Sequence, residues 1–226
     1  MTEKVLVVCG SPVVASPDLL RRLAGECDHV VAVDRGLDAL LNAGLSCDVY
    51  VGDADTVSEA GRALVDAAKD FEVERHSPYK DYTDLALALE AIRRRWPNAE
   101  VIATCATGGR PDMALSVLGL LANYKDAPVW IKEDKVTARI LHQNEAWTIE
   151  DSAGKTFSIV AIAPNTVVSE QGLEWELDHS PLGLLADTGI SNVVRGTAKI
   201  AVHTGVAIAY LLHQGFIGTA GKNNRS

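Results

Sequence analysis

The stretch "HVVAVDRGLDALLNAGLSCDVYVGDADT" (residues 29–56) contains two apolar runs separated by a segment with helical spacing. Both apolar runs, residues 29–34 and 48–53, end in an aspartate. The segment between them, residues 36–44, ends in a glycine, which favours a helix C-terminus. Near-continuous apolar strands that alternate with helices are typical of a parallel sheet with both faces covered. The stretch therefore predicts an α/β fold in which acidic residues follow the strands.

The same alternation continues on both sides of this stretch and predicts one α/β domain over residues 1–141. We expect this domain to be Rossmann-like, with an open parallel sheet that binds ligands at the carboxyl ends of its strands. The predicted strands are residues 4–10, 29–34, 48–53, 71–76, 100–107 and 127–134, and the predicted helices are residues 17–24, 36–44, 58–69, 82–96 and 111–125.

The pattern changes after about residue 141, where short and often alternating apolar runs are bounded by Gly, Asp, Asn and Pro. This spacing is typical of antiparallel strands. It predicts a smaller C-terminal β-sandwich domain over residues 142–226, with a flexible polar tail at its end. The predicted strands are residues 145–151, 156–164, 166–172, 173–178, 193–205 and 206–213.

The composition indicates a soluble globular protein and argues against several classes of partner. The chain has 226 residues and a net charge of −9, without any run of Lys or Arg, so we expect neither nucleic acid nor an anionic membrane as partner. The first apolar run is too short for a secretory signal or a membrane span. The four cysteines form no CxxC pair, and the six histidines lack metal-ligand spacing. We therefore expect a cytoplasmic protein with reduced thiols.

Charged side chains gather where the predicted parallel strands end. Ligands of open parallel sheets bind outside the carboxyl ends of the strands, so residues from separate loops are expected to meet there. Six carboxylates and two basic side chains at one edge predict a ligand site. The loops after the second to fifth predicted strands supply Asp34, Asp53, Asp55, Lys80, Asp81, Asp84, Gly108, Gly109, Arg110 and Asp112.

Each of these residues also has an ordinary structural explanation. Asp81 and Asp84 lie at the start of a strong helix, where acids cap amide groups and interact favourably with the helix dipole. Asp34 and Asp53 can be turn formers, and Arg110 can be a solvated side chain. A single motif of this kind carries little weight, and it is the combination that indicates a site.

The pair Asp53 and Asp55 predicts the chemistry of this site. Residues at i and i+2 point the same way if the strand conformation continues, and magnesium usually bridges one or two carboxylates to substrate phosphates. The Gly108–Gly109 turn before a helix offers amide groups to phosphate, and Arg110 and Lys80 can neutralise phosphate oxygens. Together these residues predict a site for ATP with Mg²⁺.

Five motifs occur in order along the chain, and the fifth has two parts. In these motifs the chain resembles the thiamine pyrophosphokinase family, whose members transfer a diphosphate group from ATP to thiamine and release AMP. The resemblance runs from about residue 31 to 202 and includes the change from the α/β to the β pattern. The motifs are "VDRG" (33–36), "VGDADT" (51–56), "KDYTDLALAL" (80–89), "TGGRPDMAL" (107–115), and "GLEWEL" (172–177) followed by "TGISN" (188–192).

The resemblance implies an ATP-dependent diphosphotransferase that uses Mg²⁺ and forms a homodimer with thiamine bound at the subunit interface. It implies that Asp53, Asp55 and Asp81 hold the metal, and that Asp81 or Asp55 accepts the proton of the thiamine hydroxyl. The implied roles are catalysis for Asp53, Asp55, Asp81 and Asp84, nucleotide or phosphate binding for Asp34, Lys80, Gly108, Gly109, Arg110 and Asp112, and thiamine binding for Ser191, Asn192 and Trp175.

Three residues depart from the family pattern, and several alternatives stay open. Met113 stands where the family usually has His, Ala54 replaces an aromatic residue, and Arg35 replaces a glycine and can either serve phosphate or block it. Trp175 is either a stacking surface for thiamine or a packed core residue. The alternative functions are a pyrophosphokinase for a hydroxymethylpterin, a nucleotide or thiamine-diphosphate sensor without turnover, and a structural protein whose acids are caps and turns.

Overall fold

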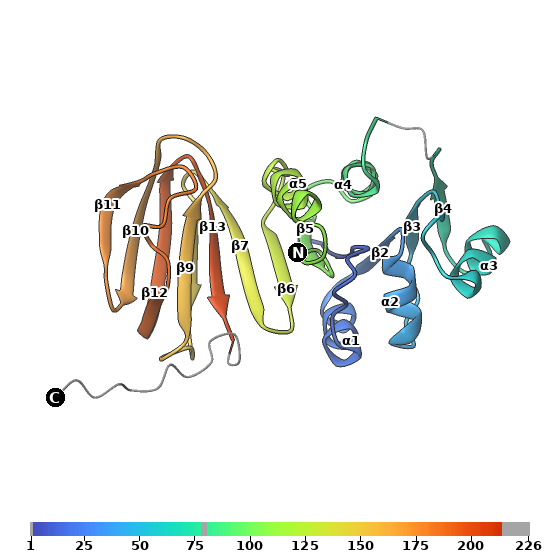
Figure 1. Ribbon diagram of the computed structural model, residues 1–226, viewed down its shortest axis with the longest axis horizontal. Coiled ribbons are helices and arrows are strands. Elements are labelled where there is room, and N and C mark those ends of the chain that lie inside the picture. Colours follow the sequence, from blue (N-terminus) through green and yellow to red (C-terminus); the bar gives the residue numbers. More distant parts are fainter. Residues whose placement is uncertain (1, 78–80, 214–226) are drawn as a thin grey trace. The chain divides into compact units, whose positions relative to one another are not determined.

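The computed structural model describes residues 2–77 and 81–213 and divides the chain into two compact units (Figure 1). The first unit comprises Met1–Asp134 and the second Lys135–Ser226. The break therefore falls before the expected boundary at residues 141 and 142, because the strand that follows Asp134 belongs to the second unit. Within the described residues, no helix combines the length and apolarity needed to cross a membrane. Lys80 lies outside the described residues.

The first unit contains a parallel sheet with the strand order β4-β3-β2-β1-β5-β6. Strands β2, β3 and β4 follow one another on one side of β1, whereas β5 and β6 lie on its other side, so the order reverses between β1 and β5. The elements are β1 Lys4–Val8, α1 Pro17–Glu26, β2 His29–Val33, α2 Gly36–Asn42, β3 Val49–Gly52, α3 Glu59–Ala67, β4 Glu72–Arg75, α4 Asp84–Arg95, β5 Glu100–Thr104, α5 Pro111–Ala122 and β6 Val129–Glu133.

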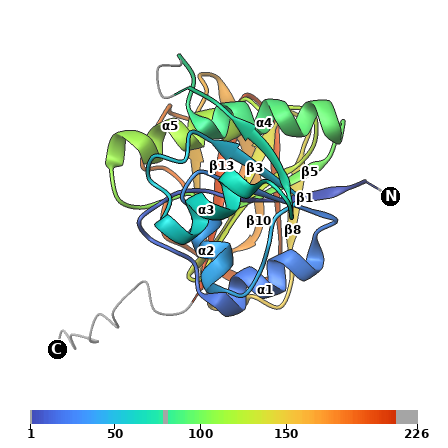
Figure 2. The ribbon, with the colours of Figure 1, turned by 90° about the vertical axis from the view of Figure 1, so that its right-hand side faces the viewer.

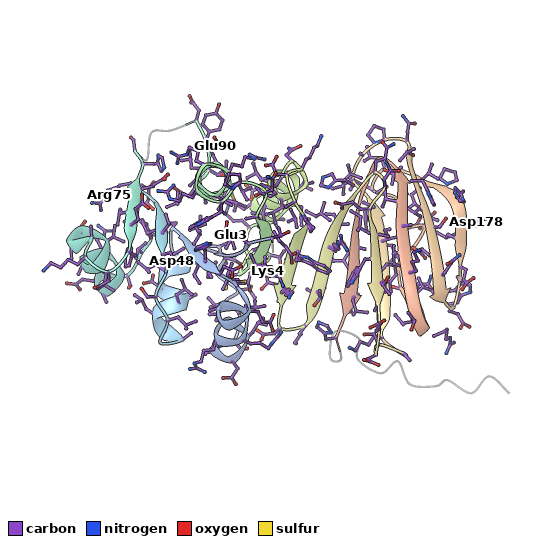
Figure 3. The ribbon with its side chains drawn as sticks, turned by 180° about the vertical axis from the view of Figure 1, so that it is seen from behind. Glu3, Lys4, Asp48, Arg75, Glu90 and Asp178 are labelled. Carbon is purple, nitrogen blue, oxygen red and sulfur yellow. The ribbon has the colours of Figure 1, made fainter. Side chains whose placement is uncertain are left out.

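Helices cover both faces of this sheet, with α4 and α5 on one face and α1, α2 and α3 on the other (Figures 1 and 2). The apolar strands explain this arrangement, because a strand that is apolar on both faces must be covered twice. Leu6 and Val8 of β1 are fully buried and form one core cluster with Leu37 and Leu40 of α2. Glu90 of α4 points away from the sheet (Figure 3). The expectation of a largely parallel α/β unit is confirmed.

The second unit is antiparallel, as expected from the short alternating runs. Its long strand β12 pairs with β9 through its first residues and with β10 and β8 farther along. The rings of Trp147 and Phe157 meet in its core with their centroids 6.5 Å apart, and Asp178 lies on the edge strand β11 (Figure 3). The strands are β7 Val136–His142, β8 Ala146–Ile149, β9 Thr156–Ala161, β10 Thr166–Leu173, β11 Leu177–Leu182, β12 Asn192–Thr204 and β13 Val206–Leu212.

Candidate functional site

Unusual backbone conformations gather where the parallel strands end. Asp34 after β2, Ala54 after β3 and Cys105 after β5 have φ values of 47°, 64° and 50°, in the left-handed region that residues other than glycine rarely adopt. Such conformations cost free energy and often occur at functional sites, where the surrounding structure holds them in place. They turn the chain sharply at the edge of the sheet where the sequence places the acids.

The carboxylates of Asp34, Asp53 and Asp55 form a compact group. Each offers one oxygen, and these oxygens all lie within 4.8 Å of one another. Asp53 Oδ1 accepts a hydrogen bond from the Asp55 amide at 3.1 Å, which fixes the turn, and Thr56 donates its hydroxyl to Asp34 Oδ2. Asp81 is exposed and lies outside this group. The structure thus brings Asp34 together with the predicted pair.

The environment of Asp34 is suited to a ligand of a bound cation. Its Oδ1 atom is buried and has no hydrogen-bond partner among the described residues. Burial raises the pKa of Asp34 against the opposing hydrogen bond from Thr56, and the nearby charges of Asp84 and Asp53 raise it further. A buried acceptor without a partner is costly. A cation bound to this group would satisfy it and remove the like-charge repulsion.

A cavity of about 620 Å³ opens beside these carboxylates, which is within the usual size range of small-molecule sites, about 300 to 1,000 Å³. Its lining comes from the ends of β1, β2, β3 and β5, the start of α4 and one side of α5. Among the described residues, Asp55, Asp81, Gly109 and Asp112 do not line it. The predicted site residues that line the cavity are Asp34, Asp53, Asp84, Gly108 and Arg110.

The start of α4 is capped by a threonine and not by one of the acids. The capping side chain is that of Thr83, whose Oγ1 accepts a hydrogen bond from the Ala86 amide at 3.3 Å. Asp84 is the first residue of the helix and lines the cavity. Asp81 lies in the turn before the cap. The explanation of Asp81 as the helix cap is therefore wrong, because threonine takes that position.

The loop after β5 needs both of its glycines. Gly108 and Gly109 have φ values of 109° and 70°, and a Cβ atom would lie 2.5 Å from the Val13 side chain at Gly108 and 2.3 Å from Pro12 at Gly109. The two residues thus let this loop pass closely over the loop that follows β1.

Glu133 at the end of β6 holds the residues just before these glycines. Its carboxylate accepts hydrogen bonds from the amides of Cys105, Ala106 and Thr107 at 3.1, 2.9 and 3.3 Å. Burial raises the pKa of Glu133, and these hydrogen bonds oppose the rise. Because Glu133 occupies these three amides, a phosphate group would have to use other donors. No sequence motif pointed to Glu133, since it lies well outside the glycine motif.

The predicted phosphate ligand Arg110 is already paired. Its Nη2 and Nε atoms lie 2.5 and 3.1 Å from the two carboxylate oxygens of Asp112, and both side chains are exposed. The hydrogen bond from Arg110 lowers the pKa of Asp112 to about 2. The sequence placed both residues at the nucleotide, and the structure shows that they bind each other.

The loop after β1 is part of the site, although none of its residues was among the predicted site residues. Gly10, Ser11 and Pro12 line the cavity, and Ser11 donates its hydroxyl to the Thr107 carbonyl oxygen at 2.9 Å. The signal was present in the sequence, because "GSP" directly follows the first apolar run and loops after parallel strands form the ligand edge. An apolar wall from α5, made by Met113, Ala114, Val117 and Leu120, completes the cavity.

The residues predicted to contact thiamine lie in the second unit and differ in exposure. Asn192 is buried, and its amide group is fully used within the chain: Nδ2 donates to the Trp175 carbonyl at 2.6 Å and to Glu170 Oε2 at 3.2 Å, while Oδ1 accepts from the amides of Trp175 and Val193 at 3.1 and 2.9 Å. Trp175 is 64% exposed, so it is not a core residue. Ser191 is exposed and has a φ of 60°. Asn192 thus positions Trp175, and Trp175 and Ser191 stay accessible.

Glu170, beside Asn192, predicts an unusual dependence of stability on pH. Its side chain is fully buried, and burial raises its pKa from 4.5 to about 7. The unfolded chain loses this proton at lower pH than the folded chain. The contribution of Glu170 to the unfolding free energy is therefore fully present below about pH 4.5 and is lost as the pH rises through 7. We expect Glu170→Gln to gain up to about 3 kcal/mol of unfolding free energy relative to the wild type between pH 4.5 and 8.

Urea unfolding at several pH values measures this difference. Glu150→Gln, at an exposed position, is the matched control and should follow the wild type throughout. If the difference in unfolding free energy between Glu170→Gln and the wild type stays constant with pH, this would contradict the raised pKa of the buried Glu170 side chain.

Comparison with known families gives two matches. Residues 20–131 match the family model of the thiamin pyrophosphokinase catalytic domain, and residues 143–208 match that of the thiamin pyrophosphokinase vitamin B1 binding domain. The first match falls within the first unit and the second match within the second unit, and neither includes the junction at Asp134.

Individual relatives agree with these matches. A thiamine pyrophosphokinase of Bacillus subtilis is 33% identical over 58% of this chain, and thiamine pyrophosphokinase 1 of Arabidopsis thaliana is 25% identical over 70% of it. The matched regions span 58% and 61% of these relatives' own lengths. Solved structures of thiamine pyrophosphokinases from B. subtilis and Candida albicans share the fold. Their TM-scores are 0.76 and 0.79 at 22% and 14% identity, with 94% and 93% of this chain and 100% and 89% of those chains covered.

The fold and the cavity define a class: a parallel α/β unit with an acid-rimmed cavity at the carboxyl edge of its sheet, followed by an antiparallel β unit. The matches to both halves then identify the family. The chain belongs to the thiamin pyrophosphokinase family.

Proposed function

We propose that the protein is a Mg²⁺-dependent thiamine pyrophosphokinase, which transfers the terminal diphosphate of ATP to thiamine. The observation that carries this proposal is the group of three carboxylates, Asp34, Asp53 and Asp55, beside a cavity inside the region that matches the catalytic domain of the family. We further propose that this first unit is the Rossmann-like nucleotide domain, and that the second unit is the thiamine-binding β-sandwich.

The residues of this group fit a magnesium ion. Carboxylate oxygens are the hard ligands that Mg²⁺ prefers, and the buried Asp34 Oδ1 atom lacks a partner among the described residues. Asp34, Asp53 and Asp55 would hold the ion, and Asp81 stays a predicted further ligand. A bound Mg²⁺ ion neutralises charge on the phosphate oxygens of ATP.

In the proposed reaction the hydroxyl oxygen of thiamine forms a bond to the β-phosphorus of ATP. The bond between this phosphorus and the oxygen that bridges to the α-phosphorus breaks, and AMP leaves with the electron pair. The hydroxyl proton passes to a carboxylate, for which Asp55 and Asp81 are the two candidates. The protein contributes mainly by positioning the two substrates and neutralising charge, as in other phosphoryl transfers.

The β unit would bind the acceptor. Exposed Trp175 offers a stacking surface for an aromatic ring, and Asn192, which follows Ser191 in the sequence, holds Trp175 in place through hydrogen bonds. Contiguous exposed apolar patches mark interaction surfaces, and three apolar residues that lie close together in the sequence of this unit, Leu184, Leu185 and Ile190, are 54%, 62% and 45% exposed. We propose a homodimer in which thiamine binds at the subunit interface. Light scattering at working concentration tests this assembly, and a monomer would contradict it.

Release of AMP tests the reaction. The protein is incubated with ATP and Mg²⁺, with and without thiamine, and AMP is followed by a coupled assay. AMP that forms only with thiamine supports the proposal. AMP that forms only with a hydroxymethylpterin would indicate that the pterin, and not thiamine, is the acceptor. Binding of ATP or thiamine diphosphate without any turnover would indicate a sensor.

A further inference from the structure

A phosphate chain bound in this acid-lined cavity requires cations beside it. Asp34, Asp53 and Asp84 line it, and a triphosphate adds several negative charges. Within the described residues, the basic side chains in its lining are those of Arg35 and Arg110, and Arg110 is paired with Asp112. Among the described lining residues, Arg35 is therefore the cation that is left to meet a phosphate chain.

Arg35 is held in a position where it can contact a phosphate chain in the cavity. It lies between Asp34, a member of the carboxylate group, and Gly36, the first residue of α2. Its side chain is partly buried, and its Nη2 atom donates to the Gly10 carbonyl oxygen at 3.3 Å. Gly10 belongs to the loop after β1 that forms another side of the cavity. This single long hydrogen bond orients the guanidinium group, while most of its donors stay available.

The guanidinium group has no competing carboxylate in the described structure. No Asp or Glu oxygen among the described residues lies within 4.0 Å of its nitrogens, although Arg21, Arg22, Arg75, Arg93, Arg94, Arg95, Arg110 and Arg195 all form such ion pairs. A guanidinium group matches the geometry of phosphate oxygens and binds them through paired, charge-assisted hydrogen bonds.

We propose that Arg35 binds the diphosphate group that is transferred, and that it supplies charge stabilisation opposite the three carboxylates. This inference rests on the proposed function. Under this proposal Arg35 binds phosphate and does not block it, because its side chain is oriented by Gly10 at the cavity wall and leaves the cavity open. As the diphosphoryl group passes from AMP to the thiamine oxygen, Arg35 would neutralise charge on its non-bridging oxygens and exchange no proton, since guanidinium stays charged.

Calorimetric titration of ATP and of AMP tests the contact, because AMP lacks the two phosphates that are transferred. We expect Arg35→Ala to weaken ATP binding about 10- to 100-fold, the loss typical of a hydrogen bond to a charged group, and to leave AMP binding within about threefold of wild type. Arg35→Lys keeps the charge but not the paired geometry, so it should restore part of the affinity. Arg22→Ala, on the exposed surface of α1, is the matched control and should bind both nucleotides as the wild type does.

Two results would overturn this inference. The first is wild-type ATP affinity in Arg35→Ala, and the second is an equal loss of ATP and AMP affinity, which would indicate a structural role. Failure of the proposed function is distinguishable, because it appears as absence of thiamine-dependent AMP in the wild type, whereas the two titrations measure binding alone. If the wild type turns over, Arg35→Ala should also lower kcat/KM for ATP with KM for thiamine unchanged.

Discussion

Replacement of Asp53 with asparagine is expected to lower kcat by about 1000-fold or more, equivalent to about 4 kcal/mol of transition-state stabilisation. Asp53 belongs to the carboxylate group and lines the cavity. Removal of one of three charges weakens metal binding, and the phosphate chain then loses its main source of charge neutralisation. Thiamine-dependent release of AMP at saturating substrates measures the loss.

The fold should survive this change. Asp53 Oδ1 accepts the Asp55 amide, and the amide oxygen of asparagine can accept the same hydrogen bond. Thermal unfolding without Mg²⁺ should therefore match that of the wild type. Asp18→Asn, an exposed acid on α1, should keep full activity. Asp81→Asn is the companion variant, since Asp81 is predicted to share the metal but lies outside the carboxylate group. Near-normal rates in both Asp53→Asn and Asp81→Asn would refute the metal-site assignment.

Replacement of Gly36 with alanine is expected to destabilise the first unit by more than about 3 kcal/mol, a large share of the stability of a typical domain. A Cβ atom at Gly36 would lie 1.9 Å from the Val8 carbonyl oxygen and 2.7 Å from its carbonyl carbon. These are backbone atoms of the central strand β1, so no flexible side chain can move aside. Either α2 or β1 must shift, together with the carboxyl edge of the sheet.

Gly25→Ala is the matched control, because a Cβ atom there has no neighbour within 4 Å. Gly25 lies within α1, where alanine favours the helix by up to about 1 kcal/mol. Urea unfolding compares the two variants, and soluble yield serves if Gly36→Ala does not fold. A Gly36→Ala protein within 1 kcal/mol of the wild type would contradict the close packing of α2 against β1.

The sequence by itself determined the order and type of the elements in the first unit and the edge at which the site lies. The apolar runs predict buried strands, and their alternation with helices predicts a parallel sheet, because local hydrophobic patterning follows directly from burial. The ordered motifs also indicated the family, which the matches to both halves confirm. The strand β7 was missed, because "VTARILH" lacks a regular alternation.

The tertiary structure decided which residues meet. It placed Asp34 with Asp53 and Asp55, paired Arg110 with Asp112, and left Arg35 at the cavity. Neighbouring positions in a motif do not reveal these partners, because side-chain direction depends on backbone turns such as the left-handed conformation of Asp34. Glu133 and the loop after β1 reach the site from distant parts of the chain. Their contacts arise only when the sheet brings the ends of β1, β5 and β6 together, and that proximity follows from strand order, which no local pattern contains.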